Sequence, residues 1–152
     1  MKLSEAVKSS ISNSVLCWLA TTDNQGQPNV SPKEIFADFR NEYIIIANIA
    51  SPKTVKNIAT NPKVCLSFID ILIQKGYQVK GTAEIIDKEN RDFEELNKVL
   101  FKMAGDKFPY ASITRIQVEQ VKPILAPSYL LYPETKESDQ IENAKKQYGL
   151  TR

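Results

Sequence analysis

The run Ser51-Pro52-Lys53-Thr54 has the residue types that a phosphate group needs. Serine is a preferred N-cap residue and proline is favoured at the first helical position, so the run predicts the start of a helix. A helix start presents unpaired backbone N–H groups and a partial positive charge, and together these bind anions. Lys53 in the first turn opposes the helix dipole unless an anion neutralises it, while Thr54 adds a hydroxyl donor. The run therefore predicts a phosphate site, and the alternative interpretation is a plain helix cap beside a solvated lysine.

A second unusual run is Ser31-Pro32-Lys33, which lies in a segment that we expect to be a strand. Proline interrupts the hydrogen-bond ladder of a strand, and the lysine interrupts its apolar pattern. Taken with the helix start at Ser51, this run favours a ligand site over a plain cap.

The residue content argues against most acid–base, nucleophilic and metal chemistry. The chain contains no histidine, which excludes histidine-based zinc sites, histidine-ligated haem and histidine general bases. Cys17 and Cys65 stand in apolar runs and are interpreted as buried, reduced thiols. We find no carboxylate pair and no nucleophile with a base, so no catalytic residue and no metal ligand is predicted.

Short segments with strand and helix patterns position these residues. The run Ser31-Pro32-Lys33 lies in the segment that follows the turn 23–27, and the run that begins at Ser51 directly follows the β-branched segment 42–50. Helices are predicted over 1–12, 51–61 and 89–104, and strands over 15–22, 28–37, 42–50, 64–72, 77–86 and 112–121. Hairpins dominate this order, so the fold class is mainly β: an antiparallel β-barrel with peripheral α-helices.

After residue 121, the three prolines at 123, 127 and 133 predict an extended, irregular path. The tail 138–152 has a helical pattern and is expected either to dock as a helix or to stay mobile. At 152 residues the chain has the usual size of one domain, so a single domain over 1–152 is predicted.

Charge and hydropathy limit which binding partners and which cellular location we expect. Twenty basic and 18 acidic residues leave a formal net charge of +2, too little to indicate nucleic acid or an anionic membrane surface. No apolar run approaches the ~20 residues of a membrane span, and the first residues lack the apolar core of a signal peptide. We therefore expect a cytoplasmic protein with no membrane or nucleic-acid partner.

The chain resembles a known family in the motifs Gly26-Gln-Pro-Asn-Val-Ser-Pro-Lys33, Ala47-Asn48, Lys53-Thr54-x-x-Asn57 and Asn61-Pro62-x-Val64. It is similar to the pyridoxamine 5′-phosphate oxidase-like, FMN-binding split-barrel family, most clearly over residues 10–86. The resemblance implies a six-stranded antiparallel split β-barrel, and a homodimer that holds FMN at the subunit interface.

The resemblance also implies which residues bind the cofactor. Lys53 and Thr54 would hold the phosphate, and Ala47, Asn48 and Ser51 would flank the ribityl chain. Val30, Ser31, Pro32 and Lys33 would line the edge of the isoalloxazine ring, where a lysine near N1 and the C2 carbonyl would stabilise the reduced ring. Five aromatic residues that could stack on a flavin are instead interpreted as core: Trp18, Tyr43, Tyr77, Phe108 and Tyr110.

The function predicted from these observations is an FMN-dependent oxidoreductase with an unknown substrate and electron donor. The region 122–132 lacks the arginine-rich signature of the true oxidases, so oxidation of pyridoxamine 5′-phosphate itself is not expected. Two alternatives stay open at this point. One is a noncatalytic FMN carrier or sensor; the other is a split barrel that binds another cofactor, such as the deazaflavin F420, or none.

Overall fold

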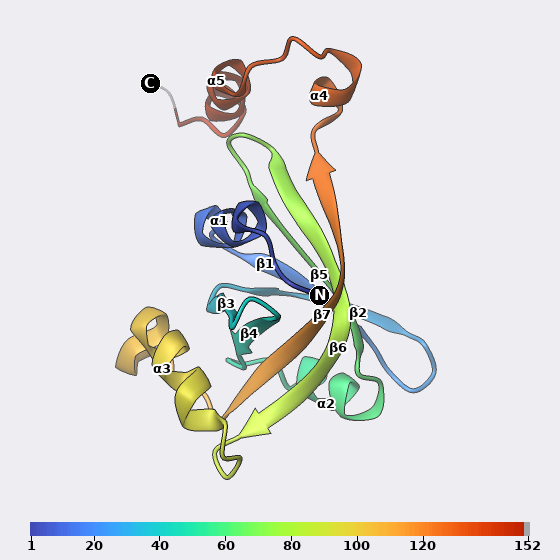
Figure 1. Ribbon diagram of the computed structural model, residues 1–152, viewed down its shortest axis with the longest axis vertical. Helices are drawn as coiled ribbons and strands as arrows, with labels where there is room; N and C mark the ends of the chain where they lie inside the picture. The colour runs from blue at the N-terminus through green and yellow to red at the C-terminus, as the bar shows by residue number, and fades with distance from the viewer. Residues whose placement is uncertain (151–152) are drawn as a thin grey trace.

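The computed structural model describes residues 1–150, which form a strongly curled antiparallel sheet with helices around it (Figure 1). The sheet has seven strands in the order β2-β1-β5-β6-β7-β4-β3. Their bounds are β1 Cys17–Thr22, β2 Pro28–Lys33, β3 Phe36–Phe39, β4 Tyr43–Ala47, β5 Lys63–Asp70, β6 Lys75–Asp87 and β7 Ser112–Leu125. The mainly β, split-barrel class predicted from the sequence is thus confirmed, with seven strands in place of six.

The seventh strand arises because the predicted strand 28–37 is two strands. β2 and β3 occupy the two opposite edges of the sheet, and only Glu34 and Ile35 connect them. A two-residue connection between opposite edges requires the sheet to curl until the edges nearly meet. The barrel is closed there by the chain itself, without a ladder between β2 and β3, and this split lies beside the candidate site.

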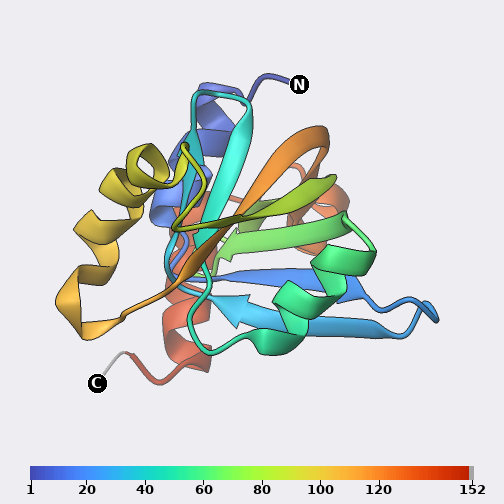
Figure 2. The same cartoon turned by 90° about the horizontal axis from the view of Figure 1, so that it is seen from below.

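Within the described residues, five α-helices surround the sheet: α1 Glu5–Asn13, α2 Pro52–Thr60, α3 Phe93–Ala104, α4 Pro127–Leu131 and α5 Glu137–Gln147. A 3-10 turn, η1, follows α3 over Gly105–Lys107. α2 lies along the hairpin of β1 and β2 (Figure 2), while α4 and α5 form an arm beyond the long β5–β6 hairpin and the end of β7 (Figure 1). In residues 1–150, no helix is both long and apolar enough to cross a membrane.

Two groups of buried side chains make up the core. The larger group fills the inside of the curled sheet and takes Val7 and Ile11 from α1. The smaller group lies under α3, where Phe93, Leu96 and Leu100 pack on Ile45 and Ile113. The stripe of α3 therefore buries the residues expected from its 3.6-residue period.

The course of the chain after residue 121 corrects our prediction. β7 continues through Pro123, which pairs with Tyr77, and ends at Leu125. β4 pairs with β7 only as far as Gln117, so the later part of β7 is a sheet edge, where a proline is tolerated. Pro127 then begins α4 in place of an irregular path, since proline fits the first helical turn.

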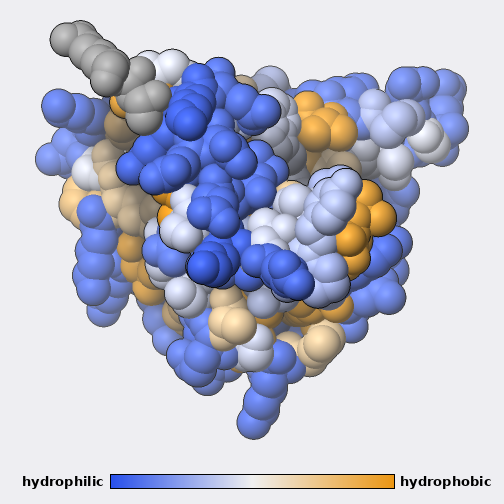
Figure 3. Space-filling model, turned by 90° about the horizontal axis from the view of Figure 1, so that it is seen from above, coloured by the Kyte–Doolittle hydropathy of each residue, from blue (hydrophilic) through white to orange (hydrophobic). Residues whose placement is uncertain are grey.

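The tail predicted as a docking or mobile helix is the helix α5. Its contacts to the β5–β6 hairpin are polar: Lys75 Nζ lies 2.7 Å from the carboxylate of Glu137, and Gln140 Nε2 donates to Gln74 Oε1 at 2.8 Å. In α5 only Ala144 is buried. The arm is therefore attached to the barrel chiefly by polar contacts. Seen from the end of the arm, its surface is mostly hydrophilic with separate hydrophobic areas (Figure 3).

Candidate functional site

A cleft of about 230 Å³ opens where β2 passes into β3 and β4 ends. The backbone N–H of Ala47 donates to the carbonyl of Ile35 at 3.0 Å, which fixes the end of β4 against the connection between β2 and β3. The residues around the cleft come from three segments of the chain: Pro32, Lys33, Glu34, Ile35, Ala47, Ile49 and Phe108. Three of these, Pro32, Lys33 and Ala47, belong to the site predicted from the sequence.

Lys33 is the buried cation of this cleft. Lys33 is only 6% exposed. In the ladder between β1 and β2 it lies opposite Cys17. Burial lowers the pKa of the Lys33 ammonium because the charged form loses hydration, and the nearby Cys17 thiol opposes this only in part. Among residues 1–150, no carboxylate forms an ion pair with the Lys33 ammonium. A buried, unpaired ammonium is costly, and an anionic or electron-rich ligand in the cleft would offset that cost.

The start of α2 also leaves polar groups without partners. Ser51 occupies the N-cap position, but its hydroxyl donates back to the carbonyl of Ile49 at 3.1 Å and does not cap the helix. The first backbone N–H bonded within this turn is that of Val55, to Ser51 at 3.3 Å. In the part of the chain that the structure describes, the backbone N–H groups of Lys53 and Thr54 have no acceptor. These are the donors that an anion at a helix start uses.

The two side chains predicted to hold a phosphate differ in exposure. The side chain of Lys53 is 53% exposed and its ammonium lies 3.9 Å from Asp23 in the turn between β1 and β2. Thr54 is buried, and its hydroxyl lies 3.0 Å from that of Ser31. Lys53 is thus half exposed to solvent and forms only a long ion pair with Asp23, whereas Thr54 ties the helix start to β2.

Asn48 and Ala50 shape the connection from β4 to α2. The Asn48 amide donates to the Ser112 hydroxyl at 3.1 Å, and its oxygen accepts from the Thr114 hydroxyl at 2.8 Å. Ala50 adopts a φ of 50°, an unusual value for a residue with a side chain. This bend ends the strand earlier than the predicted segment 42–50 and turns the chain into α2.

The asparagines of the same sequence motifs are structural. The Asn57 amide is buried and donates to the Thr21 hydroxyl at 3.0 Å, and the Asn61 amide donates to the Thr22 hydroxyl at 2.6 Å. Both bonds join α2 to β1. The motif Lys-Thr-x-x-Asn therefore combines a lysine in solvent with an asparagine that fixes the helix on the sheet.

Not every predicted site residue reaches the cleft. Val30 is 57% exposed and does not line it. Strand alternation places Val30 opposite Ala20 on the outer face of the sheet, whereas Ser31 and Lys33 point to the other face. The single run Val30–Lys33 is therefore divided between two faces.

Sequence reasoning missed Phe108, which lines the cleft and is 50% exposed. Phe108 lies between Gly105 and Pro109, outside any segment with a strand pattern. This position in the sequence could have indicated that Phe108 is not a core residue. Trp18 is also not core, because its side chain is exposed on the outer face. Tyr77 and Tyr110 pack on the two core groups, as expected.

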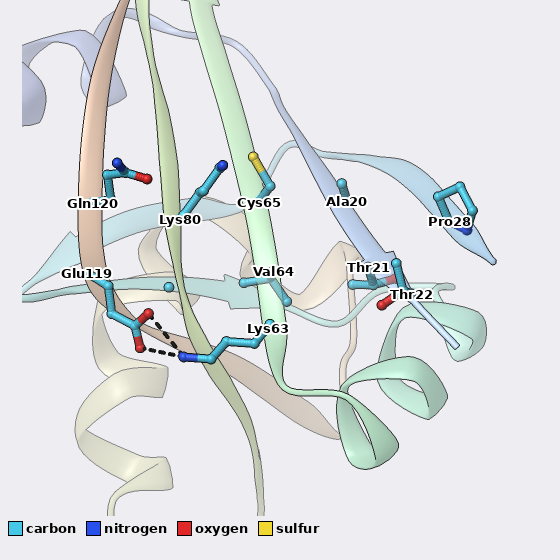
Figure 4. Close-up of a pocket in the computed structure, with 11 residues that line it drawn as sticks. Ala20, Thr21, Thr22, Pro28, Lys63, Val64, Cys65, Lys80, Glu119 and Gln120 are labelled. Carbon is cyan, nitrogen blue, oxygen red and sulfur yellow. Dashed lines mark hydrogen bonds and ion pairs between the residues drawn. The ribbon is translucent and has the colours of Figure 1, made fainter. Parts of the chain in front are cut away.

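The outer face of β1, β5, β6 and β7 carries a separate, shallow hollow of about 470 Å³ (Figure 4). Lys63 reaches across the sheet to Glu119, with Nζ–O distances of 3.0 and 3.1 Å. Cys65 and Lys80 project into the hollow beside them. A larger apolar hollow of about 630 Å³ on the same side includes Trp18 and Ile71.

Known proteins match this chain over most of its length. Residues 3–125 match the family model of pyridoxamine 5′-phosphate oxidase. An uncharacterized protein of Methanocaldococcus jannaschii is 34% identical over 104 residues, which are 66% of this chain and 68% of that protein. The arm formed by α4 and α5 lies beyond the residues that the family model matches.

Solved structures share the fold. HupZ of Group A Streptococcus superposes with a TM-score of 0.68 at 28% identity, covering 78% of this chain and 91% of that chain. An FMN-binding protein of Syntrophomonas wolfei superposes with a TM-score of 0.68 at 20% identity, covering 80% and 86% of the two chains. The family match over more than three quarters of the sequence, with the split barrel, shows that this chain belongs to the pyridoxamine 5′-phosphate oxidase family.

Proposed function

We propose that the protein binds FMN through the start of α2 and the cleft around Lys33, and that it acts as a flavin-dependent oxidoreductase. One observation carries the proposal: the two backbone N–H groups at Lys53 and Thr54 without acceptors stand beside an exposed ammonium. A phosphate is the ligand that satisfies all three donors. The FMN-binding protein of Syntrophomonas wolfei, which has the same fold, supports the choice of cofactor.

The residues of the chain would divide the binding between two ends of the ligand. Lys53 and the N–H groups of α2 would hold the phosphate, and Pro32, Lys33 and Ala47 would contact the ring. Bound FMN would supply hydride or electron transfer, and the Lys33 ammonium would stabilise negative charge on the reduced ring. Glu34 and Lys33 are the titratable side chains that line the cleft. Because FMN itself would carry out hydride or electron transfer, the proposal assigns no acid–base step to either residue.

We further propose that the working unit is a homodimer with the cofactor at the interface. Trp18 and Val30 are large apolar side chains on the outer face, 48% and 57% exposed, and the apolar hollow of about 630 Å³ adjoins Trp18. Exposed apolar area of this kind marks an interaction surface. The proposal predicts a dimer mass in sedimentation or light scattering, and a Trp18→Glu variant that is monomeric and binds FMN more weakly.

The absorption spectrum of the protein after addition of FMN and desalting tests the cofactor. Flavin bands near one FMN per chain, together with reoxidation of dithionite-reduced flavin by an added acceptor, would support the proposal. Bound flavin without turnover by reduced nicotinamides would identify a carrier or sensor. A protein that stays colourless after addition of FMN and desalting, but retains added deazaflavin F420, would refute the assignment of FMN.

A further inference from the structure

Phe108 has no packing role that explains its position. It follows the η1 turn after α3, lines the cleft beside Pro32 and Lys33, and is half exposed. Its neighbour Tyr110 packs on the smaller core group, but Phe108 belongs to neither group. A large aromatic side chain exposed at the edge of a cleft is available to a ligand.

The segment that carries Phe108 is fixed on both sides. The backbone N–H of Gly105 donates to the carbonyl of Phe101, which ends α3, and Gly105 takes a φ of 58° that turns the chain. After Phe108, the Tyr110 hydroxyl donates to Asn97 Oδ1 at 2.7 Å and holds the chain on α3. Two attachments this close in sequence limit how far the Phe108 side chain moves from the cleft.

The chemistry of the cleft indicates which ligand Phe108 contacts. Lys33 supplies a positive charge, and Pro32, Ala47 and Ile49 supply apolar surface. A flat conjugated ring with a polar, electron-rich edge matches both features, with its edge toward Lys33 and its face toward the apolar side chains. An aliphatic ligand would also use the apolar surface. It would bind no better to an aromatic side chain at position 108 than to an aliphatic one of similar size.

We propose that Phe108 forms an aromatic wall of the cleft and stacks on the flat ring that binds beside Lys33, so that it selects ligands with a planar π-system. The inference rests on the proposed function, because the isoalloxazine ring of FMN is the planar group in question. It adds a ring-binding residue from the segment before β7, a part of the chain distant in sequence from the motifs of β2 and α2.

Three variants of Phe108 and one control test the proposal by titration of the apo-protein with FMN, read as quenching of flavin fluorescence. Phe108→Ala is expected to weaken FMN binding roughly 30-fold, since the lost stacking and the lost apolar contact each contribute about 1 kcal/mol, and about 2 kcal/mol in total corresponds to roughly 30-fold. Phe108→Leu keeps apolar volume without a π-system and is expected to weaken binding about fivefold. Phe108→Tyr keeps the ring and should restore the wild-type affinity.

Phe101→Ala is the matched control, because Phe101 is also a half-exposed phenylalanine of the same region but does not line the cleft. It is expected to bind FMN as the wild type does. The visible absorption bands of bound flavin give a second readout, and their position should differ between wild type and Phe108→Leu. Unchanged thermal unfolding of each variant shows that the affinities compare folded proteins.

The outcomes separate this inference from the proposed function. If the wild type binds FMN and Lys53→Ala weakens it, while Phe108→Ala and Phe108→Leu bind as the wild type, the stacking role is refuted and the FMN site stands. Equal weakening by Phe101→Ala and Phe108→Ala refutes the stacking role as well. If the wild type fails to bind FMN, both proposals are refuted.

Discussion

The hydroxyl of Ser31 in β2 and the hydroxyl of Thr54 in the first turn of α2 lie 3.0 Å apart, although 23 residues separate them in the sequence. This contact brings the two unusual runs of the sequence together. Thr54 is buried, so the bond also decides how α2 sits on the edge of the barrel. Together with the bonds from Asn57 and Asn61 to β1, this pair of side chains fixes the start of α2, with Lys53, relative to the strand that carries Lys33.

Removing this contact should show coupling between the two residues. Ser31→Ala and Thr54→Val each remove one hydroxyl and are expected to lower the free energy of unfolding by about 1 kcal/mol. The double variant should lose less than the sum, by roughly 1 kcal/mol, since the shared bond can be lost only once. Urea unfolding of the four proteins measures this. Strict additivity would show that the two hydroxyls do not interact.

Lys53 should contribute to ligand binding but not to folding. Its side chain is in solvent, 3.9 Å from Asp23, so Lys53→Ala is expected to leave thermal unfolding nearly unchanged. Loss of a charge-assisted hydrogen bond to phosphate costs roughly 1.5–3 kcal/mol, so the dissociation constant for FMN should rise by about 10- to 100-fold.

Lys56→Ala is the control for Lys53, because Lys56 is an exposed lysine one turn further along the same helix. It should bind FMN nearly as tightly as the wild type. Riboflavin, which lacks the phosphate, should bind wild type and Lys53→Ala with the same low affinity. A lower affinity of Lys53→Ala for riboflavin would place Lys53 at the ring instead.

Asn57 should contribute to folding more than to binding. Its buried amide donates to the Thr21 hydroxyl at 3.0 Å, and Asn57→Ala leaves that hydroxyl without its donor in the core. We expect a loss of about 2 kcal/mol in the free energy of unfolding. The bond from Asn61 to Thr22 is half-buried, so Asn61→Ala should lose less. Chemical unfolding monitored by circular dichroism compares the two, and equal losses would contradict the importance of burial.

Replacing Lys33 should separate stability from binding. Lys33 is buried, burial lowers the pKa of its ammonium, and within residues 1–150 it forms no ion pair, so Lys33→Met removes a costly charge. The apo-protein is expected to gain on the order of 1 kcal/mol, which raises Tm by roughly 2–4 °C. FMN, in contrast, should bind more weakly and be harder to reduce. A Lys33→Met protein that is less stable than the wild type would indicate that the lysine has a favourable partner.

The buried thiol of Cys17 is expected to make the fold less stable at alkaline pH. Burial raises the pKa of its thiol to about 12 from an ordinary value of 9.0, with Lys33 opposing the shift. A thiol that keeps its proton in the folded state but loses it on unfolding stabilises the fold below the ordinary pKa, and this contribution decreases as the pH rises from about 9 toward about 12. The expected slope is at most about 1.4 kcal/mol per pH unit.

Cys17→Val lacks this thiol and should lose less stability than the wild type over the same pH range. Both proteins keep Lys33, whose lowered pKa acts with the opposite sign, and both keep Cys65, whose pKa burial also raises. Because Cys17 also raises the pKa of Lys33, the difference between the two urea-unfolding series reports the thiol together with this coupling. Parallel pH profiles would show that the thiol is not protected from deprotonation.

The sequence by itself determined the element types and the two chemical runs. Serine at position 51 and proline at position 52 fix a helix start, and the β-branched residues 44–46 fix a buried strand, because these effects act within a few neighbouring residues. The family resemblance carried by Lys53, Thr54 and Asn57 was confirmed by the match over residues 3–125. The FMN site and the dimer remain predictions.

Only the tertiary structure decided which residues meet. The division of segment 28–37 into β2 and β3, the passage of β7 through Pro123 and the position of Phe108 depend on strand pairing and on where the sheet has its edges. Local sequence does not contain that information, because a residue in a strand faces one side or the other according to distant partners. Alternation along β2 already separates Val30 from Lys33, which lie three residues apart in one strand, but only the pairing with β1 decides which of them faces the inside of the barrel.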